Sequence, residues 1–256
     1  MIKFFRKIRQ NLLMENKTGK YFKYAVGEIV LVVIGILIAL SINNWNENNK
    51  LRIKEKSILE NLKTSLEKDI SDHNFHYMVY QESKHSIQFL IEYMEKDKPY
   101  QDSLKYHFGR TTYLWNPNIG LEIFENLKSI GFDIISNKDL KQDILGYYSF
   151  ANKDFITGKN RYYDIISNAS LNIYNTRFRA FWNGNYSLYR ETGRHNDLEL
   201  EMIPNDFESL KKDNEFLFFL RSLKNQHYWF VETGNLHAKK EAENLLLMVN
   251  QELEKI

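Results

Sequence analysis

An uninterrupted apolar run near the N-terminus dominates the hydrophobic pattern of the chain. It extends from Ala25 to Ile42, which is 18 residues, and Glu28 is its one ionisable residue. An α-helix of this length covers roughly 27 Å, enough to cross the hydrocarbon core of a bilayer with little tilt. The pattern therefore predicts a transmembrane helix at residues 25–42. The aromatic residues that border the run, where membrane interfaces favour them, are Tyr21, Phe22, Tyr24 and Trp45.

Lysine and arginine are distributed unevenly around this run. Residues 1–24 contain seven of them against one acid, Glu15, whereas the first cation after the run is Lys50. The more basic flank of a membrane helix normally stays in the cytoplasm. We therefore expect a basic cytoplasmic arm at 1–24 and an exported domain at 43–256, which in a bacterial cell means a single-pass inner-membrane protein with a periplasmic domain.

A cleaved signal peptide is the alternative interpretation of the same segment. Signal peptides have a short basic region, a short apolar region and a small-residue cleavage site. Here the basic region is long, and Ala39-Leu40-Ser41 fits a cleavage site only loosely. These features favour a retained signal anchor.

The exported part shows helical periodicity. No proline or glycine occurs between Trp45 and Lys98, and apolar residues recur at spacings of four and seven, which is typical of one helical stripe. We expect the membrane helix to continue to about residue 96, where Lys98-Pro99 ends it.

The rest of the chain predicts further helices and a long connection. The helices are expected at 101–113, 120–130, 138–181 with a weak point at Gly158, 206–212, and from 214 onward with a kink at Gly234. A loop is expected at 183–205. Because no alternating strand pattern of convincing length appears, the predicted fold class is all-α: an N-terminal transmembrane helix that continues into an antiparallel bundle of three or four long helices.

Charge and cysteine content narrow the function classes. The formal net charge is +2, but the arm contributes +6, which leaves residues 25–256 at −4 with 28 cations against 32 acids. A mildly acidic domain is a poor nucleic-acid binder, and the arm is better suited to anionic lipid headgroups. The absence of cysteine excludes disulfides, thiolate nucleophiles and cysteine-ligated zinc.

One face of the predicted membrane helix combines a polar and two small residues. At about 100° per residue, Gly35 and Ala39 each project within roughly 20° of Glu28, one on either side of it. Small residues four apart let helices approach closely, and an intramembrane carboxylate is often functional. The hypothesis is a partner-packing face, with self-association or binding of another envelope protein. The alternative is that Glu28 snorkels to the cytoplasmic headgroups.

The candidate metal ligands are weak. Asp69, His73 and His76, with Asp72 beside them, could face one ion from a single helix. Glu82 and His85 have a spacing found in di-iron bundles, but no second Glu-x-x-His occurs. Ordinary polar surface residues are the favoured interpretation, so we expect no metal and no cofactor. No hydrolase, metalloprotease or nucleotide-binding motif occurs, and we identify no catalytic residue.

Aromatic residues cluster at three places: Tyr147-Tyr148, Tyr162-Tyr163 and His227-Tyr228-Trp229-Phe230. They could line a ligand pocket, although core packing is the favoured interpretation. The predicted 183–205 loop could recognise a partner, although a merely flexible connection is the favoured interpretation. The aromatic and basic residues that would serve recognition are Trp182, Tyr186, Tyr189, Arg190, Arg194 and His195.

Two blocks of sequence resemble a known family. GEIVLVVIGILIALSINNWNE (Gly27 to Glu47), with the basic arm before it, resembles the start of an uncharacterised family of single-pass membrane proteins from Bacteroidota, the domain of unknown function 6090. FENLKSIGFDIISNKDLKQDILGYY (Phe124 to Tyr148) is similar to a second pattern of that family. The resemblance implies inner-membrane placement with an exported domain, and it implies no activity.

These observations predict a membrane-anchored periplasmic interaction module, an accessory or scaffold component of an envelope complex. One alternative is an extracytoplasmic sensor that passes a signal through the continuous helix to a partner. A metal-dependent enzyme is a further alternative.

Overall fold

A computed structural model describes residues 18–114, 117–181, 187, 190–191 and 200–256. The chain divides into two compact units, residues 1–56 and 57–256. The described residues are mainly helical and form no strand, although an isolated β-bridge joins Phe178 and Pro204. The predicted all-α fold class is therefore confirmed.

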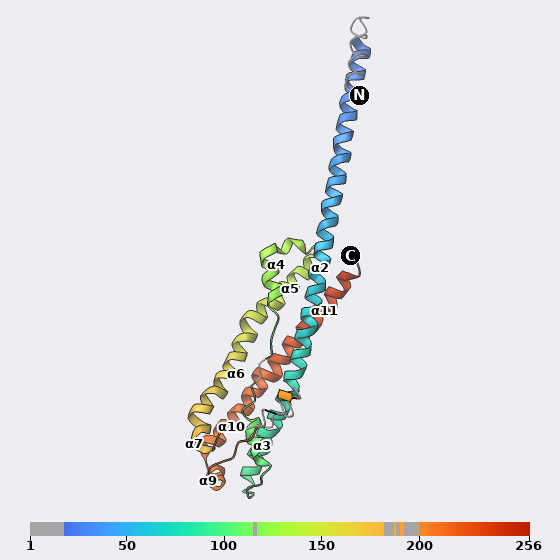
Figure 1. Ribbon diagram of the computed structural model, residues 1–256. Coiled ribbons are helices and arrows are strands. Elements are labelled where there is room, and N and C mark those ends of the chain that lie inside the picture. The colour runs from blue at the N-terminus through green and yellow to red at the C-terminus, as the bar shows by residue number, and fades with distance from the viewer. Residues whose placement is uncertain (1–17, 115–116, 182–186, 188–189, 192–199) are drawn as a thin grey trace. The chain divides into compact units, whose positions relative to one another are not determined.

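Helix α2 begins in the first unit and extends from Thr18 to Glu95 (Figure 1). Its most apolar 18-residue window has a mean hydropathy of 2.7, and none of that window is buried within the protein. It is the one helix among the described residues that is long and apolar enough to cross a membrane. The predicted apolar span is thus confirmed as a continuous helix with an exposed apolar surface.

Three long helical runs form the second unit. The first is the part of α2 from Ser57 onward. The second comprises α5 (Lys138–Phe150), η2 (Ala151–Phe155), α6 (Ile156–Ala169), η3 (Ser170–Tyr174) and α7 (Asn175–Arg177). The third comprises α10 (Asn214–Gln226), η5 (His227–Thr233) and α11 (Gly234–Leu253). Shorter helices connect them: α3 (Leu104–Arg110), α4 (Glu122–Ile130), η1 (Phe132–Ile134) and α9 (Phe207–Lys211).

The three runs do not all alternate in direction. After α3 the chain returns along the bundle before α4 begins, so the α5–α7 run is parallel to α2, and the α10–α11 run is antiparallel to both (Figure 1). The side-chain contacts agree, because Asp69 of α2 meets Tyr147 of α5, whereas Glu95 at the end of α2 meets Arg221 near the start of the third run.

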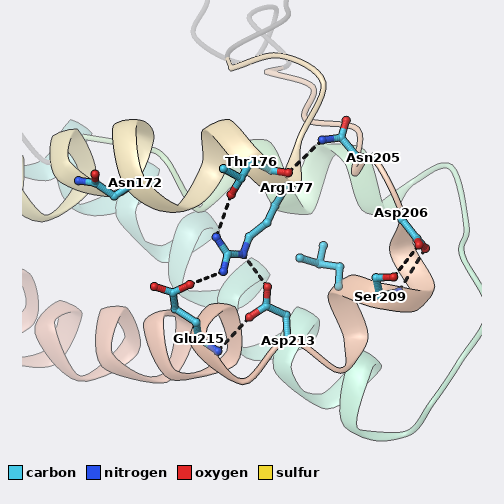
Figure 2. Close-up of a pocket in the computed structure, with 9 residues that line it drawn as sticks. Asn172, Thr176, Arg177, Asn205, Asp206, Ser209, Asp213 and Glu215 are labelled. Carbon is cyan, nitrogen blue, oxygen red and sulfur yellow. Dashed lines mark hydrogen bonds and ion pairs between the residues drawn. The ribbon is translucent and has the colours of Figure 1, made fainter.

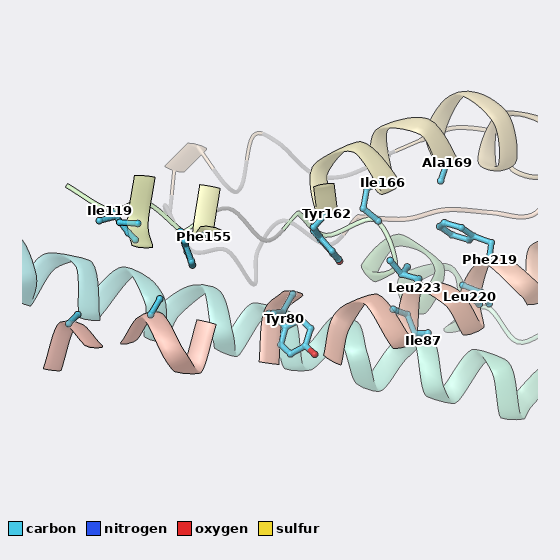
Figure 3. Packing of buried hydrophobic residues seen from close by; sticks show 14 of the residues in the cluster. Tyr80, Ile87, Ile119, Phe155, Tyr162, Ile166, Ala169, Phe219, Leu220 and Leu223 are labelled. Atoms are coloured by element: carbon cyan, nitrogen blue, oxygen red, sulfur yellow. The ribbon is translucent and has the colours of Figure 1, made fainter. Parts of the chain in front are cut away.

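The core lies between the three runs and is rich in aromatic residues. Tyr148, Tyr162, Tyr174, Phe108 and Phe216 are among its largest fully buried side chains. Figure 3 shows the cluster where α2, α6 and α10 face one another, with Tyr80, Ile87, Tyr162, Ile166, Leu220 and Leu223. Burying an aromatic or large aliphatic side chain stabilises the fold by roughly 1.5–3 kcal/mol, so this layer holds the three runs together.

Helix ends follow the local sequence closely. The side chain of Asn137 accepts hydrogen bonds from the backbone N–H groups of residues 139 and 140 at the start of α5, and Asp206 and Asp213 cap α9 and α10 in the same way. Such caps satisfy N–H groups that have no partner inside a helix. Gly131 ends α4 with φ of 100°, a conformation that costs glycine little.

The sequence predicts a weak point of the second run at Gly158 and a kink of the third at Gly234. Gly158 lies in regular helix three residues after the π-helical segment η2, and Gly234 directly follows the π-helical segment η5. A further π-helical segment among the described residues, η3, has no glycine beside it. A π-helical turn contains an extra residue. It therefore changes which side chains of the following helix face the core. The second run ends at Arg177, before the expected Phe181.

The predicted 183–205 connection lies largely outside the described residues. This applies to Trp182, Tyr186, Tyr189, Arg194 and His195, while Arg190 is helical and exposed. The described end of the connection, from Leu200 to Asn205, packs against α3 and α7, because Met202 donates its backbone N–H to the Lys105 carbonyl and Asn205 donates to that of Arg177.

Gly109 of α3 allows the closest backbone approach in this region. A Cβ atom built on Gly109 would lie 1.7 Å from the carbonyl oxygen of Leu200. No side chain fits that space without moving the backbone. By contrast, a Cβ on Gly146 of α5 would meet no atom within 4 Å.

We predict opposite effects for alanine at these two glycines. Gly109→Ala should lower the free energy of unfolding by about 3 kcal/mol or more, because the methyl group overlaps backbone atoms. Gly146→Ala should raise it by about 0.5–1 kcal/mol, because alanine is the better helix former. Thermal and denaturant unfolding of the full chain in lipid nanodiscs measures both. Equal effects of the two substitutions would contradict the close approach of α3 and Leu200.

Candidate functional site

The predicted partner-packing face lies on α2 in the first unit. Glu28 is half-buried, whereas Gly35 and Ala39 are exposed, and a Cβ on Gly35 would meet no atom within 4 Å. The helical spacing puts the three residues on one stripe. The protein thus leaves the flat part of this stripe open, which a packing surface for a second helix requires.

Two of the four predicted interface residues can be placed. Phe22 and Trp45 are each 70 % exposed, so both rings are open to the surroundings of the helix. The side chains of Tyr21 and Tyr24 lie outside the described residues, as does the arm up to residue 17.

The candidate metal ligands face different partners. Asp69 and His73 are buried in the second unit, whereas His76 is half-buried. Nδ1 of His73 lies 2.8 Å from the side-chain oxygen of Asn235 in α11, and Nε2 of His76 lies 3.9 Å from a carboxylate oxygen of Asp72. Within the part of the chain that the structure describes, no group of three or more His, Asp or Glu side chains is placed to hold a metal ion.

Asp69 and Asp72 instead fix the segment that returns along the bundle. The Gly120 N–H donates to Asp69 at 2.9 Å, and the Asn118 N–H donates to Asp72 at 2.6 Å. The hydroxyl of Tyr147 donates to the second oxygen of Asp69 at 3.2 Å. Asp69 therefore joins α2, the 117–121 segment and α5 at one buried point.

The environment of Asp69 raises the pKa of its carboxyl group. Burial raises the pKa of this carboxyl group to about 6, and the hydrogen bonds from Gly120 and Tyr147 offset part of the effect. Because the folded pKa exceeds the unfolded value of 3.8, the folded state binds the proton more tightly. The resulting stabilisation is fully present below pH 4 and disappears as the pH rises through about 6.

We predict that Asp69→Asn removes this pH dependence. Asparagine keeps an acceptor for the Gly120 N–H and stays neutral. Relative to the variant, the wild-type chain should lose about 2 kcal/mol of unfolding free energy between pH 4 and pH 7. Denaturant unfolding of both proteins across this pH range gives the difference between their unfolding free energies. Because both proteins contain the same other titrating groups, the contributions of those groups cancel in this difference. A constant difference would show that Asp69 titrates normally.

The predicted aromatic clusters divide between core and surface. Tyr147, Tyr148, Tyr162 and His227 are buried in the bundle, which agrees with core packing. The Tyr162 hydroxyl lies 2.7 Å from Nε2 of His227 and 3.2 Å from the carbonyl oxygen of Tyr113. Burial lowers the pKa of His227 to about 3, so this histidine is neutral at physiological pH.

Sequence reasoning missed a polar pocket of about 490 Å³ at the end of the second run (Figure 2). Arg177 of α7 is its centre. The guanidinium donates to Asp213 through Nε at 2.7 Å and also to Glu215, to the Ile173 carbonyl at 3.1 Å and to Thr176 at 3.0 Å. These contacts join α7 to the start of α10, and the two carboxylates neutralise the charge of Arg177. The residues that line this pocket therefore connect the second and third runs.

A second pocket, of about 410 Å³, lies between the second and third runs. It is lined by Phe150, Lys153, Asp154, Phe155, Thr157, Gly158, Arg161, Trp229, Phe230 and Gly234. We call it the η2–η5 groove, since five of these residues belong to those two π-helical segments. The clustering of aromatic residues at 228–230 was the sequence signal for it.

Residues 28–103 match the sequence profile of a family of unknown function, DUF6090. The match starts inside the apolar segment of α2 and ends just before α3. It confirms the predicted resemblance in this part of the chain, while the second block that we compared, Phe124 to Tyr148, lies beyond it. The bacterial group stays a prediction. No curated protein and no solved structure matches the chain.

Proposed function

We propose that this protein is a membrane-anchored interaction module, an accessory or scaffold component of a bacterial envelope complex. The arm at 1–24 is cytoplasmic, 25–42 crosses the inner membrane, and 43–256 lies in the periplasm. The observation that carries the proposal is the apolar window of α2, of which nothing is buried within the protein.

The exposure of this window requires a partner. Ile29, Leu31 and Ile42 are 64 %, 64 % and 61 % exposed, and contiguous apolar patches of this extent are rare on soluble monomers. A bilayer covers such a surface on every side of the helix and leaves no backbone group unpaired. The lysine and arginine excess of residues 1–24 supports an N-terminus in the cytoplasm.

The stripe of Glu28, Gly35 and Ala39 supports assembly inside the membrane. Because Gly35 and Ala39 have no side-chain atoms beyond Cβ, a second helix can approach this stripe closely. The carboxyl group of Glu28 can then form a hydrogen bond across the contact. We propose self-association through this stripe, with another envelope protein as the alternative occupant.

The extracytoplasmic sensor is a second candidate, and the continuity of α2 favours it. The same helix contains the apolar window and, from Ile58 onward, core residues of the second unit. A shift of such a helix is a known way to transmit a change between two sites. Signalling would require a separate output protein that contacts the arm.

Single cysteines test the orientation, because the natural chain has none. We predict that a membrane-impermeant maleimide labels Lys224→Cys in spheroplasts, whereas Arg9→Cys is labelled only after lysis. The reason is the distribution of positive charge around residues 25–42. Labelling of both positions in intact spheroplasts, or of Arg9→Cys alone, would contradict the proposed topology.

Cysteine crosslinking tests the stripe. Val32 lies beside it and Leu37 about 180° from Glu28 on the helix, so we predict that Val32→Cys forms disulfide-linked dimers in membranes and the control Leu37→Cys does not. Adding Gly35→Leu and Ala39→Leu should lower the Val32→Cys yield about fivefold, which corresponds to about 1 kcal/mol. Equal yields from both cysteines would rule out a specific stripe.

A further inference from the structure

The η2–η5 groove combines two π-helical segments from different runs. Lys153, Asp154 and Phe155 belong to η2, and Trp229 and Phe230 belong to η5. Single π-helical turns inside α-helices occur frequently at functional sites. Here two of them line the same pocket.

The aromatic side of the groove is open. Trp229 is 65 % exposed, whereas Phe155 is buried and forms an edge-to-face contact with His73 at 5.3 Å between ring centroids. Gly158 of α6 contributes to the space, because a Cβ there would meet Cδ1 of Phe230 at 3.4 Å. The groove therefore offers a buried aromatic floor and a tryptophan ring that a flat ligand can cover.

The charges of the groove are not used within the protein. Lys153, Arg161 and Asp154 are exposed, and none of them forms an ion pair with another residue in the described parts of the chain. Arg177 in the other pocket differs, since Asp213 and Glu215 neutralise it. Two cations against one acid leave the η2–η5 groove with a net positive charge beside its aromatic surface.

We propose that the η2–η5 groove binds a small amphipathic organic anion. The planar or apolar body of the ligand lies against Trp229 and Phe230, and its carboxylate or similar group pairs with Arg161 and Lys153. A pocket of about 410 Å³ lies within the size range of small-molecule sites, which are mostly apolar with a few polar groups that set orientation. This inference goes beyond the proposed function and does not depend on the anchor.

The net charge decides between an anion and a cation. An exposed tryptophan also attracts cations through its ring face, and Asp154 would assist such a ligand. Arg161 and Lys153 outnumber Asp154, and guanidinium–carboxylate pairs are strong and directional. The groove therefore favours the anion.

Three ligands with the same naphthalene ring test the proposal: naphthalene-2-carboxylate, its neutral amide and the cationic 2-naphthylmethylammonium. Calorimetric titration of the full chain in phosphatidylcholine nanodiscs, with empty nanodiscs subtracted, gives their affinities. We expect the carboxylate to bind about tenfold more tightly than the amide, as one charge-assisted contact provides, and the cation to bind most weakly.

Variants assign the binding to the groove. The double substitution Lys153→Gln and Arg161→Gln should remove the advantage of the carboxylate over the amide, and Trp229→Ala should weaken both about tenfold. The matched controls, Lys224→Gln and Phe218→Ala, alter an exposed cation and an exposed ring outside the groove and should change neither affinity. Circular dichroism and unfolding midpoints verify that each variant is folded.

Three results would overturn the proposal. One is equal affinity for the carboxylate and the amide. Another is tighter binding of the cation, which would assign the groove to a cationic ligand. The last is an equal loss of binding in the groove variants and in the controls, which would place the ligand elsewhere on the protein or in the lipid.

Discussion

Helix α2 presents two apolar surfaces that need different partners, and the rest of the structure depends on how each is covered. Around residues 29–42 apolar side chains are exposed on every side of the helix, so only a surrounding apolar medium or another helix can cover them. From Ile58 onward the apolar side chains form a stripe that is buried, with Leu59, Leu62 and Leu66 fully enclosed. The second unit exists as a fold because two further helical runs cover that stripe.

The α5–α7 run is parallel to α2 because the chain returns along the bundle between α3 and α4. Of this returning segment, residues 113–114 and 117–121 are not helical. Its N–H groups then need acceptors other than helical carbonyls. Asp69 and Asp72 accept two of them, which fixes the return path and also places a carboxyl group where burial opposes its charge.

Local chemistry explains what could be predicted from the sequence. The apolar run, the end of α2 before Pro99, the glycine end of α4 and the start of α5 after Asn137 all follow from interactions between residues a few positions apart. The close approach of Gly109 to Leu200 and the ion pairs of Arg177 join residues that are 36 or more positions apart in the sequence, and no local pattern marks them.

The positions of the π-helical segments are also not predicted by any local sequence pattern. Glycine was the sequence signal for an irregular helix, yet Gly158 lies in regular helix and η2 comes just before α6. An extra residue in a turn changes which side chains face the core, so its position is decided by the neighbouring runs. In η2 a buried Phe155 lies two positions from an exposed Lys153. In η5 a buried His227 lies two positions from an exposed Trp229.

The polar pocket around Arg177 and the η2–η5 groove differ in whether their charges are already paired. In the polar pocket each charge of Arg177, Asp213 and Glu215 is paired, so a ligand would have to break an existing ion pair in order to form a new one. In the η2–η5 groove Arg161 and Lys153 give up only hydration when they bind an anion, and the ring of Trp229 is dehydrated at the same time. Hydrophobic burial and charge pairing then both favour a single binding event, and no ion pair inside the protein has to break for it.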